Sequence, residues 1–186
     1  CLASTIVVGS PLATAAGVVG VLALGVGCGL VNGLIVVYGR LQPIITTLAT
    51  GACYYGFALA LRPTPGGDIN GDFADALTGQ VFGGVPTILL VLLAVVLLVW
   101  VPYRRSVVGR AAYAVGSNEA AAYMSGVDVN RAKLTAYVLS GFLASLAGLL
   151  LTCLTYSGEA SSPIGGTYTL DAIAAVVIGG TSLFGG

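Results

Sequence analysis

The stretch PYRRSVVGRAAYAVGSNEAAAYMSGVDVNRAK, residues 102–133, is the most polar part of this chain and decides how the rest is interpreted. It carries two acids, Glu119 and Asp128, and five of the seven basic residues: Arg104, Arg105, Arg110, Arg131 and Lys133. Long apolar runs without charge flank it on both sides. A short basic loop between two such runs is typical of the cytoplasmic side of an inner-membrane protein, because basic loops are retained on that side.

The overall composition also indicates a membrane protein. Hydrophobic residues make up 57% of the 186 residues and charged residues 8%, with a mean hydropathy of +1.00. Soluble domains carry about 25% charged residues, so this chain has too little charge to solvate a globule. We therefore expect an all-α, polytopic membrane protein with discontinuous or re-entrant segments. Residues 1–186 form a single transmembrane domain, and we expect it to be partial at both ends.

Uncharged segments of about the length needed to span the hydrocarbon core, roughly 20 residues, occur at 12–38, 44–61, 81–101 and 134–154. Residues 1–9 are interpreted as the end of a further helix. Residues 170–178 are too short to cross and predict a re-entrant or broken helix, because an α-helix rises about 1.5 Å per residue.

Small residues at helical spacing predict where these helices pack. Gly25, Gly29 and Gly33 recur every fourth residue and form one face, on which a neighbouring backbone can approach closely. A second group at helical spacing comprises Ser140, Ala144, Ala147 and Gly148. Asn32 lies beside the first stripe, and we expect its side chain to bond to another helix.

The remaining charges agree with one orientation of the chain. The loop at 62–80 carries three acids against Arg62, and the loop at 155–168 carries Glu159, so both are expected outside. Arg40, in a polar turn, lies inside together with residues 102–133. The acids of the first loop, Asp68, Asp72 and Asp75, do not match the ligand spacing of an EF-hand, so no metal site is predicted.

Side chains suited to catalysis are scarce. Histidine is absent, and the four cysteines (Cys1, Cys28, Cys53 and Cys153) lie in apolar segments without a CxxC pair. They are interpreted as small buried residues. We therefore expect no catalytic residue in this chain.

A short helix is predicted inside the basic loop, at 119–125. Asn118 is a good N-cap, Glu119 lies at the positive end of the helix dipole, and Gly126 can adopt the left-handed conformation that ends a helix. So short a helix is not stable in water alone and must dock. It docks either on its own neighbours or in a cleft of a cytoplasmic partner.

The segment GRAAYAVGSNEAAAYMSGVDVNRAKLTAYVLSGFLASLAGLL, residues 109–150, resembles the cytoplasmic loop and following helix of permease subunits of ABC importers for monosaccharides. The stretch GLVNGLIVVYGRLQPIITTLAT (29–50) and the tail YTLDAIAAVVIGGTSLFGG (168–186) are similar to the same family. These importers are of the ribose/xylose/arabinose type, within the branched-chain amino acid/sugar permease superfamily. The loop at 62–80 departs from the shorter turn common in the family, which leaves the substrate open.

The resemblance implies that 102–133 is a coupling loop, whose helix docks on an ATP-binding subunit. The residues expected to make this contact are Asn118, Glu119, Ala120, Ala121, Ser125 and Gly126. It also implies a periplasmic sugar-binding protein, a second permease copy and a bacterial inner-membrane location. No phosphate-binding GxxxxGK[ST] motif occurs, so ATP and Mg²⁺ are expected in the partner and no cofactor in this chain. Membrane lipid is an expected partner and nucleic acid is not.

Candidates for the translocation path are Asn32, Thr46 and Asp171. Asp171 is an acid at membrane depth, or else it caps the amino terminus of its own helix. Thr46, like Thr47 and Thr50, either lines a polar path or bonds back to its own helix. An ion-coupled secondary transporter, a permease for another solute (a nucleoside, an autoinducer or a branched-chain amino acid) and a non-transporting scaffold remain alternatives.

Overall fold

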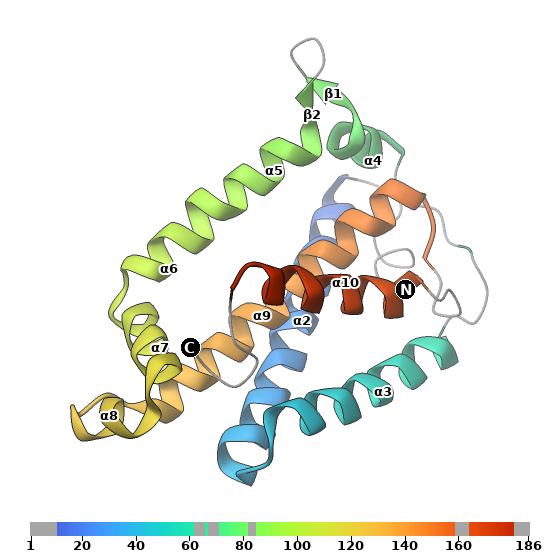
Figure 1. Ribbon diagram of the computed structural model, residues 1–186. Helices are drawn as coiled ribbons and strands as arrows, with labels where there is room; N and C mark the ends of the chain where they lie inside the picture. The colour runs from blue at the N-terminus through green and yellow to red at the C-terminus, as the bar shows by residue number, and fades with distance from the viewer. Residues whose placement is uncertain (1–10, 62–65, 67–70, 82–84, 159–163, 181–186) are drawn as a thin grey trace.

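The computed structural model describes residues 11–61, 66, 71–81, 85–158 and 164–180 (Figure 1). The expected helix end at 1–9 lies outside these residues, as do Asp68 and Glu159. The elements in chain order are α2 (Pro11–Gly39), α3 (Pro43–Leu61), α4 (Gly71–Thr78), β1 (Gln80–Val81), β2 (Val85–Pro86), α5 (Thr87–Val95), the π-helical turn η1 (Val96–Trp100), α6 (Val101–Arg105), α7 (Val107–Ser117), α8 (Glu119–Met124), α9 (Val129–Thr155) and α10 (Ile164–Ile178). The predicted all-α class is confirmed, since the two strands form only a hairpin of two residues each.

Four helices in the described part of the chain are long and apolar enough to cross a membrane: Ala13–Gly39, Pro43–Leu61, Thr87–Arg105 and Val129–Thr155. They correspond to the four predicted segments. The start of the third was misplaced, because Gln80–Val81 pair with Val85–Pro86 as the strands β1 and β2 and the helix begins only at Thr87. The fourth begins before residue 134, because the Asp128 carboxylate accepts a hydrogen bond from the Arg131 N–H (3.1 Å) and caps α9 there.

The centre of the fold is the crossing of α2 and α9 (Figure 1). Gly25, Gly29 and Gly33 all face α9, so the predicted packing stripe is on an interface between helices. A Cβ at Gly33 would lie 2.9 Å from Leu134 Cδ1, and one at Gly29 would overlap the Tyr137 carbonyl oxygen. The missing side chains therefore allow the two backbones to touch.

The matching face of α9 differs from the predicted one. Gly141 and Ser145 contact α2, whereas Ser140, Ala144, Ala147 and Gly148 are exposed. Both sets have helical spacing and small side chains, so spacing alone could not choose between them. The rotation of α9 about its axis decides which set is buried.

The outer end of the crossing is closed by α4. Ala74 of α4 packs with Leu149 and Cys153 of α9 in a small buried cluster. The Tyr156 hydroxyl donates a hydrogen bond to the Asp75 carboxylate, and Gly158 N–H donates to the Gly66 carbonyl (3.2 Å). These contacts hold the segments before the third span and after the fourth span together.

The third span stands apart from the crossing. It packs mainly on α4 at one end and on α7 at the other, and α5, η1 and α6 contain no buried residue (Figure 1). Its π-helical turn precedes Pro102, which has no N–H to donate to the residue four positions back. Instead the Val101 N–H donates to the Val96 carbonyl.

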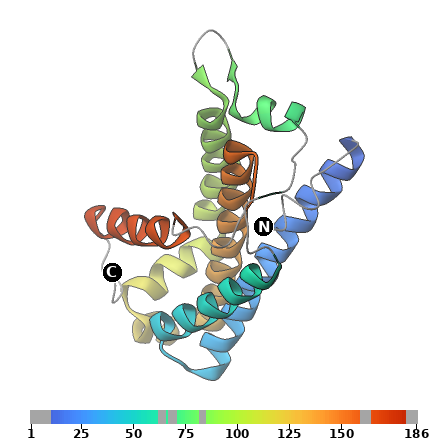
Figure 2. The same ribbon diagram turned by 90° about the vertical axis from the view of Figure 1, so that its right-hand side faces the viewer.

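The ends of the molecule separate as the charge pattern predicts. The turn between α2 and α3, which contains Arg40, lies at the same end as α8, while α4 and the hairpin lie at the opposite end (Figures 1 and 2). Helix α10 lies to one side and runs across the direction of α9 (Figure 2). It begins at Ile164, earlier than predicted, but its 15 residues extend only about 22 Å, which is less than a full span.

Candidate functional site

The polar region between the third and fourth spans is built as a corner of short helices. After α6, Ser106 is extended, and its hydroxyl donates to the Tyr103 carbonyl (2.7 Å). The same oxygen accepts a hydrogen bond from the Gly109 N–H (3.0 Å) and so caps α7. A Cβ at Gly109 would overlap the Tyr103 carbonyl oxygen, so glycine is required for this close turn. The chain thus changes direction at residues 105–107 without a long loop.

Helix α8 has the N-cap residue and the left-handed glycine that the sequence predicts. The Asn118 side chain accepts a hydrogen bond from the Ala121 N–H (3.0 Å), and Gly126 is left-handed with φ = 79°. The Val127 N–H donates to the Ala122 carbonyl (3.1 Å), which closes the C-terminal turn. The helix ends at Met124, one residue before the predicted end.

One side of α8 is attached to the chain itself. Ala122 is buried, and the Glu119 carboxylate accepts a hydrogen bond from the Lys133 ammonium at 2.6 Å. This ion pair joins the first residue of α8 to the first turns of α9. The interpretation that α8 docks on its own neighbours is therefore correct for this side.

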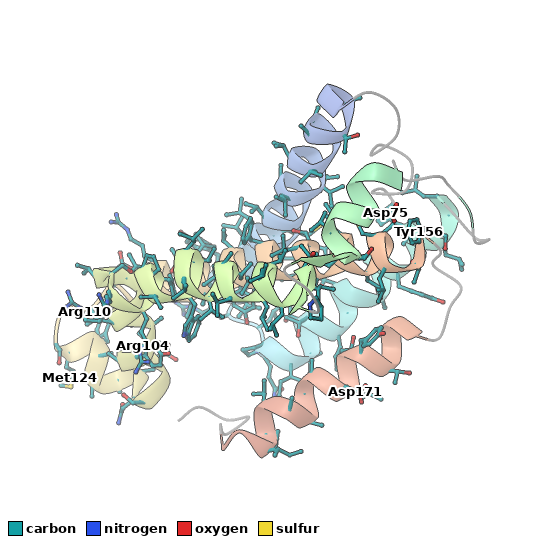
Figure 3. All side chains as sticks on the ribbon, turned by 90° about the horizontal axis from the view of Figure 1, so that it is seen from above. Asp75, Arg104, Arg110, Met124, Tyr156 and Asp171 are labelled. Atoms are coloured by element: carbon teal, nitrogen blue, oxygen red, sulfur yellow. The ribbon has the colours of Figure 1, made fainter. Side chains whose placement is uncertain are left out.

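The C-terminal end of α8 is free of such contacts within the described residues and is exposed. Tyr123 is 74% exposed and Met124 is 87% exposed, and Figure 3 shows Met124 at one extreme of the structure. Ala120, Ala121, Ser125 and Gly126 are also exposed. Tyr123, Met124 and Lys133 were not among the residues predicted from the sequence to make the contact. The available signal was a pair of large apolar side chains at the end of an otherwise small and polar helix.

A groove of about 480 Å³ lies beside α8. Its lining comes from α7, α8, α9 and the residue between α7 and α8, and includes Val115, Ser117, Asn118, Glu119, Lys133 and Ala136. The predicted contact residues Asn118 and Glu119 thus line a concave surface at the first residue of α8, whereas the exposed Tyr123 and Met124 lie at the other end of this helix. A groove and an exposed apolar tip on one short helix are suitable for docking a partner protein.

The three candidates for the translocation path lie on three different helices, α2, α3 and α10. No hydrogen bond or ion pair joins them to one another within the described residues. The Oδ1 atom of Asn32 is buried and has no hydrogen-bond partner there, so the expected bond from this atom to another helix is not observed.

Thr46 is buried, and its hydroxyl donates to the Gln42 carbonyl (3.0 Å). Thr47 and Thr50 bond back to their own helix in the same way. Asp171 is exposed on α10 (Figure 3). It lies seven residues after the first residue of that helix, so the capping interpretation is wrong. A path-lining role for Asn32, Thr46 or Asp171 stays a prediction.

The four span-length helices, the close glycine crossing and the capped helix between two spans define a polytopic α-helical membrane protein. The chain belongs to the family described as branched-chain amino acid transport system / permease component, whose sequence model matches residues 1–186.

Named relatives support this assignment. The ribose import permease protein of Haemophilus influenzae is 40% identical over 171 residues, which cover 89% of this chain and 52% of the relative. That of Escherichia coli K12 is 39% identical over 188 residues, covering 97% and 57%. The autoinducer 2 import system permease protein of Salmonella choleraesuis is 33% identical over 171 residues, covering 89% and 51%. The chain thus spans about half the length of the curated relatives it matches. No solved structure matches it.

Proposed function

We propose that this chain is the membrane-spanning core of a permease subunit in an ATP-driven importer, which moves a monosaccharide delivered by a periplasmic binding protein. The observation that carries the proposal is the capped helix α8, which lies between two spans and exposes the side chains of Tyr123 and Met124 on the surface of the molecule. Membership of a permease family supports the transport role.

In this proposal α8 docks on a separate ATP-binding subunit, which supplies ATP and Mg²⁺. Tyr123 and Met124 enter a cleft of that subunit, because large apolar side chains gain most from leaving water. The ion pair between Glu119 and Lys133 ties α8 to α9, so that a displacement of α8 is passed to the fourth span. The α6–α7 corner passes the same displacement to the third span.

The substrate class is inferred from the relatives. Two of those described above are ribose import permeases, and a third serves autoinducer 2 import. We therefore propose a monosaccharide of the ribose type as the transported solute, with D-ribose as the first probe. Two permease copies in the bacterial inner membrane, with residues 102–133 in the cytoplasm, complete the proposed assembly.

Uptake of labelled D-ribose by cells carrying the full-length protein tests the proposal. We expect uptake to stop when ATP is depleted while the ion gradients are maintained. Loss of uptake when the gradients alone are collapsed would instead indicate an ion-coupled transporter. If the cells take up another solute in an ATP-dependent way but not D-ribose, the proposed substrate is wrong and the proposed energy source is still supported.

Substitutions at Met124 test the role assigned to α8. Met124→Asp places a charge at the exposed tip and is expected to reduce uptake at least tenfold, with normal membrane insertion. Met124→Leu keeps an apolar side chain of similar volume and is the matched control, expected to stay within about twofold of the natural protein. Equal uptake by the two variants would contradict docking through this tip.

A further inference from the structure

A second groove lies on the same end of the molecule as α8, at the junction of the third span with α7, and no residue of α8 lines it. Its volume is about 500 Å³, and it is lined by Trp100, Val101, Arg104, Arg105 and Arg110. Three arginines from two helices therefore meet one indole ring around a single cavity. Figure 3 shows Arg104 and Arg110 together at this end of the structure.

The corner described above builds this arrangement. Ser106 and Gly109 turn the chain sharply after α6, so that Arg110 of α7 comes beside Arg104 and Arg105 of α6. Arg104 is held further by the Tyr113 ring, whose centroid lies 6.0 Å from its guanidinium carbon. The Trp100 and Tyr103 rings lie 6.3 Å apart on the membrane side.

No acid in the part of the chain that the structure describes balances the positive charge in this groove. The ion pairs found among the described residues join Arg131 to Asp128 and Lys133 to Glu119. No acid lines the groove, and all three of its arginines are exposed. Like charges held at one corner repel one another, so a bound anion would stabilise the arrangement.

The groove lies where lipid headgroups are expected, which indicates the source of that anion. The span Thr87–Arg105 has 19 residues and a length of about 28 Å, close to the thickness of the hydrocarbon core. Its last turn therefore reaches the headgroup layer, where tryptophan rings are favoured. Trp100 and Val101 supply an apolar wall on the side of the acyl chains, and the arginines supply the polar wall.

We propose that this groove binds the phosphodiester headgroup of an anionic glycerophospholipid from the surrounding leaflet. Guanidinium groups match a phosphate with paired hydrogen bonds, and three of them favour an anionic lipid over a zwitterionic one. The site requires only that Thr87–Arg105 spans the membrane and does not depend on the transported solute.

Trp100 is the single tryptophan of residues 1–186 and reports directly on the groove. The probe is the full-length protein, with any tryptophan outside residues 1–186 replaced by phenylalanine. It is reconstituted in zwitterionic vesicles with a small fraction of phosphatidylglycerol. Bromine on the acyl chains of one lipid at a time quenches Trp100, and the ratio of the two quenching curves gives the preference for the anionic lipid.

We expect a clear preference for phosphatidylglycerol that weakens at high salt, because the charges are partly solvated. Each basic residue near a membrane surface changes the affinity for an anionic lipid about fivefold. In the variant with both Arg104→Gln and Arg110→Gln, the affinity of the groove for phosphatidylglycerol should therefore fall roughly 25-fold. The variant with Arg104→Lys and Arg110→Lys keeps the charges but not the paired hydrogen bonds, so it should lose less of the preference than the glutamine variant. Arg131→Gln removes one charge outside the groove and is the control expected to leave the preference unchanged.

Several results would overturn the proposal. One is a ratio of one between the two quenching curves of the natural protein, which would mean no preference for the anionic lipid. Another is the same ratio in the glutamine and lysine variants. Displacement of the lipid by millimolar glycerol 3-phosphate would show that the groove takes a free phosphate ester. Loss of the preference once the ATP-binding subunit is bound would show that the groove belongs to a protein interface.

Discussion

Three side-chain caps set the geometry of the region between the third and fourth spans. Ser106 caps α7, Asn118 caps α8 and Asp128 caps α9, each through a backbone N–H three residues later. Asn118 and Gly126 could be identified from the sequence because capping depends on local bonds. The ion pair of Glu119 with Lys133 could not, since the two residues are 14 positions apart and meet only after the chain has turned.

Removing the Asn118 cap should loosen α8. Asn118→Ala deprives the Ala121 N–H of its acceptor and is expected to cost about 1 kcal/mol. Hydrogen exchange at Ala121 should then be about fivefold faster, as measured on the full-length protein by mass spectrometry. Ser117→Ala is the matched control, because the Ser117 hydroxyl donates to the Ala114 carbonyl within α7. Equal exchange in both variants would mean that the cap does not stabilise α8.

Tyr156 gives a test at the opposite end of the molecule. Its hydrogen bond to the Asp75 carboxylate raises the pKa of the phenol above the ordinary value of 10.0, because the bond favours the protonated form. The stabilisation by this bond is therefore present below pH 10 and is lost as the pH rises through the higher folded-state pKa.

Asp75→Asn should lower the pKa of Tyr156 towards its ordinary value. The measurement is an NMR titration of ¹³Cζ-labelled tyrosine, with Tyr156→Phe to assign the signal among the nine tyrosines. An unchanged Tyr156 titration in Asp75→Asn would contradict the bond.

For the helices, the sequence predicted which segments are spans and how long they are better than it predicted which face of a span is buried. The four apolar segments were recognisable because a span requires a long uncharged run. The start of the third span was misplaced because residues 80–86 are mostly apolar, and only Gly83, Gly84 and Pro86 signalled a turn. The face of α9 was misassigned because two sets of small residues share the helical period. Which set is buried depends on where α2 lies.

The glycine crossing of α2 and α9 is testable with a matched pair on one helix. Gly29→Ala puts a methyl group against the Tyr137 carbonyl and should destabilise the protein by about 1–3 kcal/mol. A Cβ at Gly27 meets nothing within 4 Å, so Gly27→Ala should be neutral or stabilising by up to about 1 kcal/mol. Denaturation of the full-length protein in detergent measures both. Similar stabilities for the two variants would contradict the close approach of α2 to α9.

In the whole molecule, α2 and α9 form the most extensive contact between helices among the described residues, and the third span is attached mainly at its two ends. The inner attachment is the α6–α7 corner next to α8, and the outer one is α4 with the hairpin. A displacement of α8 would therefore be passed to the third and fourth spans through short capped helices. Sequence patterns placed the charged loops at opposite ends, but not this linkage, which depends on contacts between α7 and α9.

The proposed path residues show the limit of sequence reasoning at this scale. Asn32, Thr46 and Asp171 were chosen as polar groups in apolar segments, but they lie on three separate helices. Whether they face a common path depends on how α2, α3 and α10 are oriented, which a pattern of polar residues in apolar segments does not encode. The predicted single domain 1–186, with its coupling loop at 102–133, stays a prediction.

The most direct test of the central claim is to find what contacts α8 in native membranes. A photoreactive amino acid is placed at Met124 in the full-length protein, and a matched one at Leu98, which is 75% exposed within the third span. Irradiation followed by mass spectrometry identifies the captured molecules. We expect position 124 to capture an ATP-binding subunit and position 98 not to capture it. Capture of lipid alone at position 124, in a correctly inserted protein, would contradict the role proposed for α8.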